Sequence, residues 1–320
     1  MRIIYLGTPE FAVPTLEKLL AWPKAEVVGL VCQPDRPAGR GKHIFAPPTK
    51  LVAQAHNIPV FQPEKLSKSA EIVAAMRDLK PDVLVMVAFG QILKRDVLEL
   101  APWKVVNLHG SLLPKYRGAA PINWAIINGE TVTGITTMLS DQGVDTGDML
   151  LQRQIPLGPD TYAEELSRTM SIVGAELVIE TLDQLRQGKL APVAQDDSQA
   201  TYAPRLTKEM GAIDWFADAR QIHNLVRGLS PWPGTFTYFR GTCLKVIATA
   251  PKTATAGVCG LAQKPGSVIA TNPVVEVACG KDGSQSIELL EVQVPGKAKV
   301  AARNWANGIR LQAQEVLGSP

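Results

Sequence analysis

The sequence has 320 residues, of which 46% are hydrophobic and 20% are charged, and its formal net charge is +3. This length is enough for one large or two ordinary domains, and the balance of apolar and charged residues excludes an intrinsically disordered chain. The longest uninterrupted apolar run is Val83–Phe89. A membrane-spanning helix needs roughly 20 residues, so we expect no membrane span. Thr8-Pro9-Glu10 ends the first apolar run too early for a secretory signal.

Cysteine and histidine do not occur at the spacings of metal sites. No two of the four cysteines form a CxxC pair, and the four histidines include no HExxH motif. A disulfide-stabilised protein of this length would need more cysteines, so we expect free thiols and a reducing, cytoplasmic environment. We also predict no bound metal. The residues concerned are Cys32, Cys243, Cys259, Cys279, His43, His56, His109 and His223.

The first half of the chain alternates segments typical of strands with segments typical of helices. A helix is expected after Thr8, although Pro14 indicates a kink or a new start near Val13. Strands separated by helices predict parallel pairing, because parallel strands need a crossover connection. We therefore expect an α/β fold with a doubly wound, mostly parallel, Rossmann-like sheet. The expected strands are Arg2–Leu6, Glu26–Cys32, Asp82–Ala88 and Lys104–Leu108.

Two further strands and a long helix follow. Thr133–Leu139 and Met149–Ile155 read as strands joined by a polar, glycine-rich turn. Thr161 and Glu164 have the spacing of a capping box, and the apolar residues after them recur at helical intervals until Gly188. This segment is predicted to be a packing helix without a chemical role.

The character of the sequence changes after about Lys189. Ala191–Lys208 is polar and contains two prolines, which favours a linker. Beyond it we expect one helix near Ala219–Leu229 and then short strands with Gly and Pro turns, typical of a small barrel. Residues 206–320 contain twelve basic and eight acidic side chains, which is compatible with a polyanionic partner. We expect a first domain over 1–189, a linker over 190–208 and a second domain over 209–320.

The loop after the first strand argues against a dinucleotide cofactor. A Rossmann dinucleotide site has GxGxxG at this place, whereas Gly7-Thr8-Pro9-Glu10 has a single glycine, and its carboxylate would repel a pyrophosphate. A Walker lysine motif is also missing from the sequence.

Asn107 and His109 belong to the densest polar cluster at a predicted strand end, Asn107–Pro121. They are two residues apart, so on an extended backbone they face the same side. An amide and an imidazole that converge on one point can polarise a carbonyl and move a proton. A structural asparagine and a histidine with satisfied hydrogen bonds would have the same spacing, and local spacing does not decide between the two interpretations.

Acidic residues and glycines alternate in a second cluster, Asp141–Asp148. Such residues usually form turns, because an aspartate side chain accepts hydrogen bonds from its own backbone. Local evidence favours this interpretation. The functional alternative is that one of these aspartates approaches His109 and fixes its tautomer or its charge.

The third segment of interest is Gln33–Pro48, which is too long for an ordinary loop between a strand and a helix. Its charge is basic, with Arg36, Arg40 and Lys42 against one aspartate. Such a loop can enter a nucleic-acid groove. A solvated, flexible insertion explains the same composition equally well.

Taken together, these segments resemble the methionyl-tRNA formyltransferase family. The Asn-x-His and Ser-Leu-Leu-Pro signature is shared by the wider folate-dependent formyltransferase superfamily, including enzymes that formylate small amines. The Arg-rich loop and the second domain favour the tRNA enzyme. The resemblance covers nearly the whole chain and is weaker after about Gly296. The matching segments are Gly7–Ala12, Gln33–Gly41, Asn107–Pro121, Asp145–Met149, Ile213–Trp215, Ile222–Asn224 and Pro231–Gly234.

This resemblance implies transfer of a formyl group from the co-substrate 10-formyltetrahydrofolate to the amino group of methionyl initiator tRNA. It implies a catalytic trio of Asn107, His109 and Asp145. From the chemistry of the reaction we expect the amide to donate to an oxyanion, the imidazole to move protons and the carboxylate to orient the imidazole. The resemblance also implies a second domain that is an OB-like barrel and helps to hold the tRNA. We expect a cytoplasmic monomer that binds neither metal nor membrane.

The resemblance assigns the other site residues as follows. A cis peptide bond is expected at Leu113-Pro114, beside the folate pocket. The residues implied in folate binding are Ser111, Leu112, Leu113, Pro114, Val87, Ala88, Phe89, Gly90 and Asp141. Those implied in tRNA binding are Arg36, Arg40 and Lys42.

Three alternative functions are weighed against this one. A formyltransferase for a small amine, such as a nucleotide sugar or glycinamide ribotide, is disfavoured by the basic loop and the second domain. An inactive tRNA-binding protein is disfavoured by the intact trio. Hydrolysis of the formyl donor by water is distinguished by product analysis with and without an acceptor.

Overall fold

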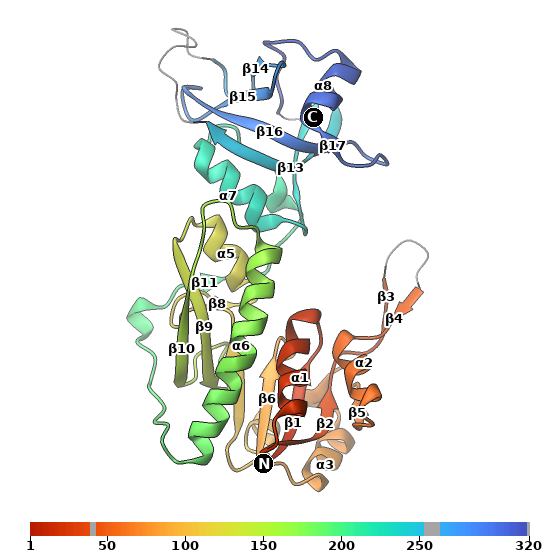
Figure 1. The fold of residues 1–320 in the computed structure, drawn as a ribbon, viewed down its shortest axis with the longest axis vertical. Coiled ribbons are helices and arrows are strands. Elements are labelled where there is room, and N and C mark those ends of the chain that lie inside the picture. Colours follow the sequence, from red (N-terminus) through yellow and green to blue (C-terminus); the bar gives the residue numbers. More distant parts are fainter. Residues whose placement is uncertain (39–42, 253–262, 319–320) are drawn as a thin grey trace. The chain divides into compact units, whose positions relative to one another are not determined.

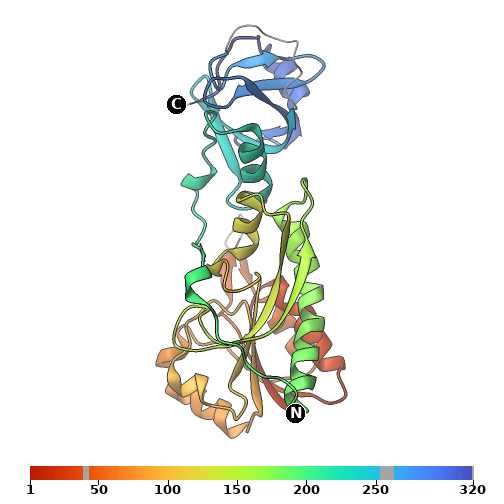
Figure 2. The ribbon, with the colours of Figure 1, turned by 90° about the vertical axis from the view of Figure 1, so that its left-hand side faces the viewer.

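The computed structural model describes residues 1–38, 43–252 and 263–318, shown in two views (Figure 1 and Figure 2). They form two compact units. The first unit comprises Met1–Pro121, Val132–Pro156 and Leu166–Ala203, and the second comprises Ile122–Thr131, Leu157–Glu165 and Pro204–Pro320. None of the described helices combines the length and the apolar composition needed to cross a bilayer.

The first unit is built on a seven-stranded sheet. The strands nearest its centre run parallel, and β9 is antiparallel to both of its neighbours. This mostly parallel sheet with helices confirms the predicted α/β class. In spatial order the strands are β10 (Met149–Pro156), β9 (Val132–Leu139), β7 (Val105–His109), β6 (Val83–Val87), β1 (Arg2–Gly7), β2 (Glu26–Val31) and β5 (Val60–Phe61).

Helices cover both faces of this sheet. On one face, Gly174 of α6 (Ala163–Arg186) lies against Leu108 of β7, and the hydroxyls of Thr181 and Thr137 are 2.8 Å apart. Figure 1 and Figure 2 show α1 (Val13–Ala21) on the same side. The opposite face is covered by α3 (Ala70–Asp78) and α4 (Arg95–Leu98), whose apolar residues form one buried cluster with β1, β6 and β7. A further helix, α2 (Pro48–Ala55), connects β4 to β5 along the chain.

The first helix begins where the prolines allow it to begin. Residues 10–12 form a short 3-10 turn, and α1 then begins at Val13. Pro14 falls in the first helical turn, where its missing N–H group breaks no hydrogen bond. The new start near Val13 is therefore confirmed.

The polar stretch after α6 is hydrogen-bonded to the first unit. Val193 and Met149 exchange two backbone hydrogen bonds of 2.8 Å. Further along, β11 (Tyr202–Ala203) pairs with β8 (Arg117–Gly118) in parallel. Part of the segment whose composition predicts a linker thus belongs to the first unit.

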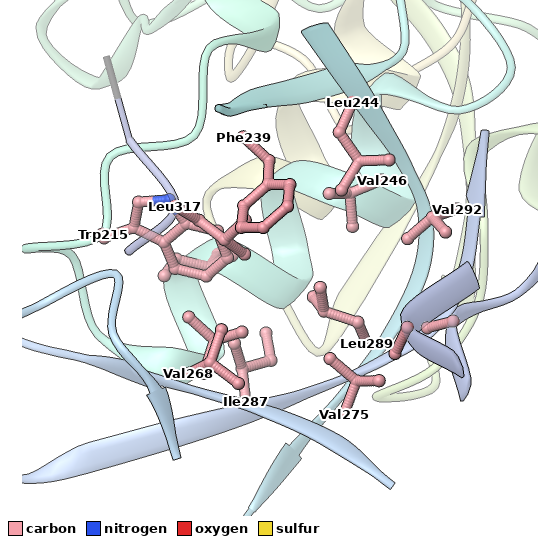
Figure 3. Close-up of a cluster of buried hydrophobic side chains, with 14 of the residues drawn as sticks. Trp215, Phe239, Leu244, Val246, Val268, Val275, Ile287, Leu289, Val292 and Leu317 are labelled. Atoms are coloured by element: carbon pink, nitrogen blue, oxygen red, sulfur yellow. The ribbon is translucent and has the colours of Figure 1, made fainter. Parts of the chain in front are cut away.

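The second unit contains a curled antiparallel sheet, which confirms the expected small β-rich domain. Figure 3 shows its core, in which Trp215, Phe239 and Leu317 meet apolar residues that alternate with exposed ones along the strands. The strand order is β12 (Thr235–Phe239), β13 (Thr242–Lys252), β16 (Gln285–Gln293), β15 (Val275–Cys279) and β14 (Val268–Ala270), with β17 (Val300–Ala301) paired to β16. The helices are α5 (Pro121–Ile127), α7 (Ala219–Leu229) and α8 (Ala302–Ile309).

The described cysteines carry free thiols, as expected. Cys32, Cys243 and Cys279 form no disulfide, and Cys259 lies outside the described residues. Burial raises the pKa of Cys32 to about 11 and that of Cys279 to about 12. Both thiols therefore stay protonated near neutral pH and act as small apolar core groups.

Gly134 marks a close approach of β9 and β10. A β-carbon here would lie 2.3 Å from the carbonyl oxygen of Arg153. We expect Gly134→Ala to destabilise the protein by about 1–3 kcal/mol, because backbone has to shift. The measurement is the urea midpoint of unfolding, followed by circular dichroism. As a control, Gly308 in α8 has open space around it, so Gly308→Ala should raise the stability by about 0.5–1 kcal/mol. An unchanged midpoint for Gly134→Ala would contradict the close approach.

Candidate functional site

Strand register places three side chains in a row on one face of the sheet. Met86 of β6 is the register partner of Asn107 in β7, which in turn is the partner of Met138 in β9. Partners in register point to the same face, and His109 lies two residues further along β7 on that face. The neighbouring Leu108 points to the opposite face, against α6. The amide and the imidazole therefore lie on the face away from α6, as their spacing predicts.

His109 is buried between two oxygen atoms. Its Nε2 lies 2.9 Å from the carbonyl oxygen of Tyr116. A carbonyl oxygen only accepts hydrogen bonds, so we assign the proton to Nε2. Its Nδ1 lies 3.5 Å from Oδ2 of Asp145, and the exposed fractions of the two side chains are 6% and 16%. The structure thus brings the histidine and one aspartate of the acidic cluster together, although 35 positions of the chain separate them.

The backbone at Asp145 adopts the left-handed conformation, with φ of 56°. This conformation is uncommon for residues other than glycine, although aspartate tolerates it better than most. Oδ2 of Asp145 accepts a hydrogen bond of 2.9 Å from the amide of Gly118. The carboxylate is therefore held by a fixed donor on one side and faces the imidazole on the other.

The two aspartates named from the sequence differ in what they bind. Oδ1 of Asp141 accepts hydrogen bonds from the amide of Gly143 at 3.0 Å and from the hydroxyl of Thr146 at 2.7 Å. This is the turn geometry that local sequence favours for the whole cluster. Asp145 departs from it, because its carboxylate is directed to β7 and β8 instead of to its own turn.

Asn107 has a buried side chain whose amide is available to a ligand. Its exposed fraction is 7%, and no side-chain hydrogen bond joins it to another residue of the described ranges. The amide is therefore free to hydrogen-bond to a molecule that reaches it. Asn107 also lines a cavity, together with Asp145.

This cavity has a volume of about 110 Å³ and lies over the row of register partners. The turn that follows β9 forms one side, and the residues after β6 form the other. Sequence reasoning named three of the lining residues, Asn107, Asp141 and Asp145. It missed the lining residues that strand register and turn geometry bring to the cavity. For two of them, Met86 and Met138, the alternation of side chains along a strand could have indicated the face. The missed residues are Met86, Gln91, Ile92, Leu93, Met138, Ser140, Gly143 and Val144.

The lining suits a flat, partly polar ring. Most of the missed side chains are apolar, and Ser140 adds a buried hydroxyl oxygen that has no hydrogen-bond partner among the described residues. Small-molecule pockets are typically apolar with a few placed polar groups. A flat ring with an apolar face and a polar edge has the chemistry to fit these residues.

The loop over residues 111–114 is hydrogen-bonded to the strands of the site but does not line this cavity. Its Leu113-Pro114 bond is cis, as expected. The hydroxyl of Ser111 donates to the carbonyl of Lys115 at 2.6 Å, and the hydroxyl of Thr136 donates to the carbonyl of Ser111 at 2.7 Å. Leu112 is half-buried, and Leu113 is buried.

The segment Val87–Gly90 lies between two groups of cavity residues, Met86 before it and Gln91–Leu93 after it, but is not itself part of the lining. The backbone at Ala88 is left-handed, with φ of 47°. The carbonyl of Phe89 accepts a hydrogen bond of 3.0 Å from the side chain of Gln33. The segment therefore turns the chain at the end of β6.

The basic segment contains a short antiparallel pair, β3 (Arg36–Ala38) and β4 (His43–Phe45), where a long irregular loop was expected. The guanidinium of Arg36 pairs with Glu64 at 2.6 Å, and both side chains are largely exposed. Arg40 and Lys42 lie outside the described residues. Among the described residues, no group of three or more His, Cys, Asp or Glu side chains is arranged to hold a metal ion.

Comparison with known proteins assigns the family. The formyl transferase family model matches residues 1–182, and the model of the formyl transferase C-terminal domain matches residues 205–310. The methionyl-tRNA formyltransferase of Geobacter metallireducens is 47% identical, over 99% of this chain and 99% of its own length. That of Trichlorobacter lovleyi is 49% identical, over 96% and 94%. The chain belongs to the methionyl-tRNA formyltransferase family.

The fold of this formyltransferase recurs in solved structures of low sequence identity. The sugar 3N-formyltransferase WlaRD is 18% identical with a TM-score of 0.67, over 93% of this chain and 99% of its own. The N-formyltransferase of Helicobacter canadensis is 20% identical with a TM-score of 0.67, over 90% and 98%. HypX from Aquifex aeolicus, solved with tetrahydrofolic acid, has a TM-score of 0.61 at 18% identity, over 98% of this chain and 48% of its own.

Gly118 is the donor that holds Asp145. Its φ is 121°, and a β-carbon would lie 2.7 Å from the carbonyl oxygen of Ala203. We expect Gly118→Ala to lower turnover about tenfold or more, because the displaced amide releases the carboxylate. The measurement is kcat for formyl transfer. The control is Gly188→Ala, since Gly188 also has a positive φ but lies in open space; it should reduce stability only. Equal kcat values for both variants would contradict this role.

Proposed function

We propose that this chain transfers the formyl group of 10-formyltetrahydrofolate to the α-amino group of methionyl initiator tRNA, for use in translation initiation. The full-length relationship to methionyl-tRNA formyltransferases supports the reaction. The observation that carries the site assignment is the meeting of His109 with Asp145 beside a cavity that Asn107 also lines.

The proposed reaction needs an oxyanion donor and a path for one proton. The neutral amine attacks the formyl carbon and forms a C–N bond, and the bond from that carbon to N10 of the donor then breaks. The amine loses a proton and N10 gains one, so no oxidant or reductant is required. The side-chain amide of Asn107 donates to the oxygen that becomes negative in the tetrahedral intermediate.

His109 and Asp145 handle the proton in this proposal. Because Nε2 of His109 is hydrogen-bonded to the carbonyl oxygen of Tyr116, Nδ1 is the nitrogen that can take up and release a proton. The carboxylate of Asp145 fixes the orientation of the ring. The imidazole takes the proton that the amine loses and passes it to N10, or donates to the oxyanion.

The cavity next to Asn107 is proposed as the donor site. Its apolar walls hold the pterin ring, and Ser140 offers a hydroxyl to the polar edge of the ring. Asp141 closes the turn above it. The loop Ser111–Pro114 and the segment Val87–Gly90 complete the proposed folate site by fixing the ends of β7 and β6.

The basic segment and the second domain are proposed to hold the tRNA. Arg36, Arg40 and Lys42 contact the acceptor end, where arginine can stack on a freed base or bind phosphates. The proposed domains are a catalytic domain over 1–189, a linker over 190–208 and an OB-like tRNA-binding domain over 209–320. The family matches over 1–182 and 205–310 support these limits. We propose that the protein acts as a cytoplasmic monomer.

The trio is tested by single substitutions. Asn107→Ala and His109→Ala should each lower kcat about 10²–10³-fold, the usual loss for one oxyanion-hole donor. The assay uses labelled 10-formyltetrahydrofolate and charged initiator tRNA and measures N-formylmethionine. Binding of the tRNA to both variants should be nearly unchanged. Turnover equal to that of the unmodified protein would remove the residue from the mechanism.

Formylation of a nucleotide sugar amine in place of the tRNA would overturn the proposed acceptor.

Arg40 is expected to act through the nucleic acid. Arg40→Ala should lower kcat/KM with initiator tRNA at least tenfold while leaving the reaction with a minimal amine within about twofold. Added salt should weaken tRNA binding by the unmodified protein more steeply than by the variant, because each phosphate contact releases counterions. Equal losses on both acceptors would indicate a damaged pocket instead of a lost RNA contact.

A further inference from the structure

The side chain of Gln195 reaches into the turn that presents Asp145. Its Nε2 donates one hydrogen bond of 2.9 Å to the carbonyl oxygen of Asp145 and another of 2.7 Å to that of Gly147. Both protons of the amide are therefore used on the backbone of one turn. The residue comes from the polar stretch after α6, 50 positions later in the chain.

Arg117 fixes the orientation of this amide. Its Nε donates to Oε1 of Gln195 at 3.0 Å, and its Nη2 pairs with Asp197 at 2.7 Å. The exposed fraction of the Arg117 side chain is 3%. Because Nε is always a donor, the oxygen of Gln195 has to face Arg117, and its NH₂ group then has to face the two carbonyls.

The turn needs such support, because the left-handed backbone of Asp145 is unfavourable for a residue with a β-carbon. Conformations of this kind persist where the surrounding structure determines them. The polar stretch after α6 also holds Tyr116 and Gly118, which are hydrogen-bonded to His109 and Asp145. The hydroxyl of Thr201 accepts from the amide of Tyr116, whose carbonyl binds His109. Ala203 pairs with Gly118, whose amide binds the carboxylate of Asp145.

We propose that Gln195 is a positioning residue for formyl transfer, which fixes the turn at Asp145 so that the carboxylate faces His109. Arg117 supports it by fixing the direction of its amide. Gln195 does not belong to the residues that line the cavity. This inference rests on the proposed function of the trio, and it assigns a role in the transfer step to a segment whose composition indicates only a linker.

The matched pair Gln195→Ala and Gln199→Ala tests this role. Gln199 lies in the same polar stretch, and its side-chain amide donates to Oδ2 of Asp196 at 2.7 Å. We expect Gln195→Ala to lower kcat about 10–100-fold, since small misplacements of a catalytic group cost rates of that order. The KM values for donor and acceptor and the melting temperature should stay close to those of the unmodified protein. Gln199→Ala should leave kcat unchanged. A merely structural role would lower the melting temperature without the selective loss of kcat.

A substitution of nearly equal size tests whether the NH₂ donor of Gln195 is required. Gln195→Glu keeps the acceptor that faces Arg117 but replaces the NH₂ donor with a carboxylate oxygen facing two carbonyls. It should be as impaired in kcat as Gln195→Ala, or more so. Near-normal kcat in Gln195→Glu would overturn the proposal.

Hydrogen exchange supplies a readout that does not depend on activity. Peptides covering 140–150 should exchange faster in Gln195→Ala than in the unmodified protein or in Gln199→Ala, because the turn loses two hydrogen bonds. Unchanged exchange would overturn the positioning role whatever the reaction. If the unmodified protein formylates no methionyl-tRNA, the proposed function fails instead. Faster exchange in Gln195→Ala would then show that Gln195 stabilises the turn although the protein does not catalyse that reaction.

Discussion

The site depends on one turn that brings a carboxylate to a buried imidazole. The Nδ1 of His109 and the Oδ2 of Asp145 are 3.5 Å apart, and the backbone of Asp145 is left-handed where it presents this carboxylate. A carboxylate beside a histidine fixes the orientation of the ring. Without this turn, the aspartate would belong to an ordinary surface loop like that of Asp141.

Groups from distant segments hold the turn and the imidazole. The amide of Gly118 donates to the carboxylate of Asp145, and the side chain of Gln195 donates to the carbonyls of Asp145 and Gly147. The carbonyl of Tyr116 binds Nε2 of His109. These partners come from the loop after β7, from β8 and from the polar stretch after α6. The conformational cost of ordering the site is therefore spread over several segments and is not carried by His109 and Asp145 alone.

Local sequence patterns predicted much of this architecture. The helix expected near Ala219–Leu229 is observed with those limits, and β1, β6 and β7 lie where the apolar runs placed them. Asn107 and His109 share a face because alternation in a strand is a local property. The contribution of Gln195 was not predictable in this way, because its partners are 48 and 50 positions away and no periodicity links them.

The sequence by itself determined the α/β class, the change to a β-rich second half, the same-face placement of Asn107 and His109, and a resemblance that named the family. These follow from short-range preferences and from motifs read along the chain. Only the tertiary structure decided which aspartate meets the imidazole, which side chains line the cavity, and that the stretch from Val193 to Ala203 braces the site. The physical reason is that strand register, a left-handed backbone and side-chain hydrogen bonds between remote segments are fixed when the sheet assembles, and local composition carries no record of them.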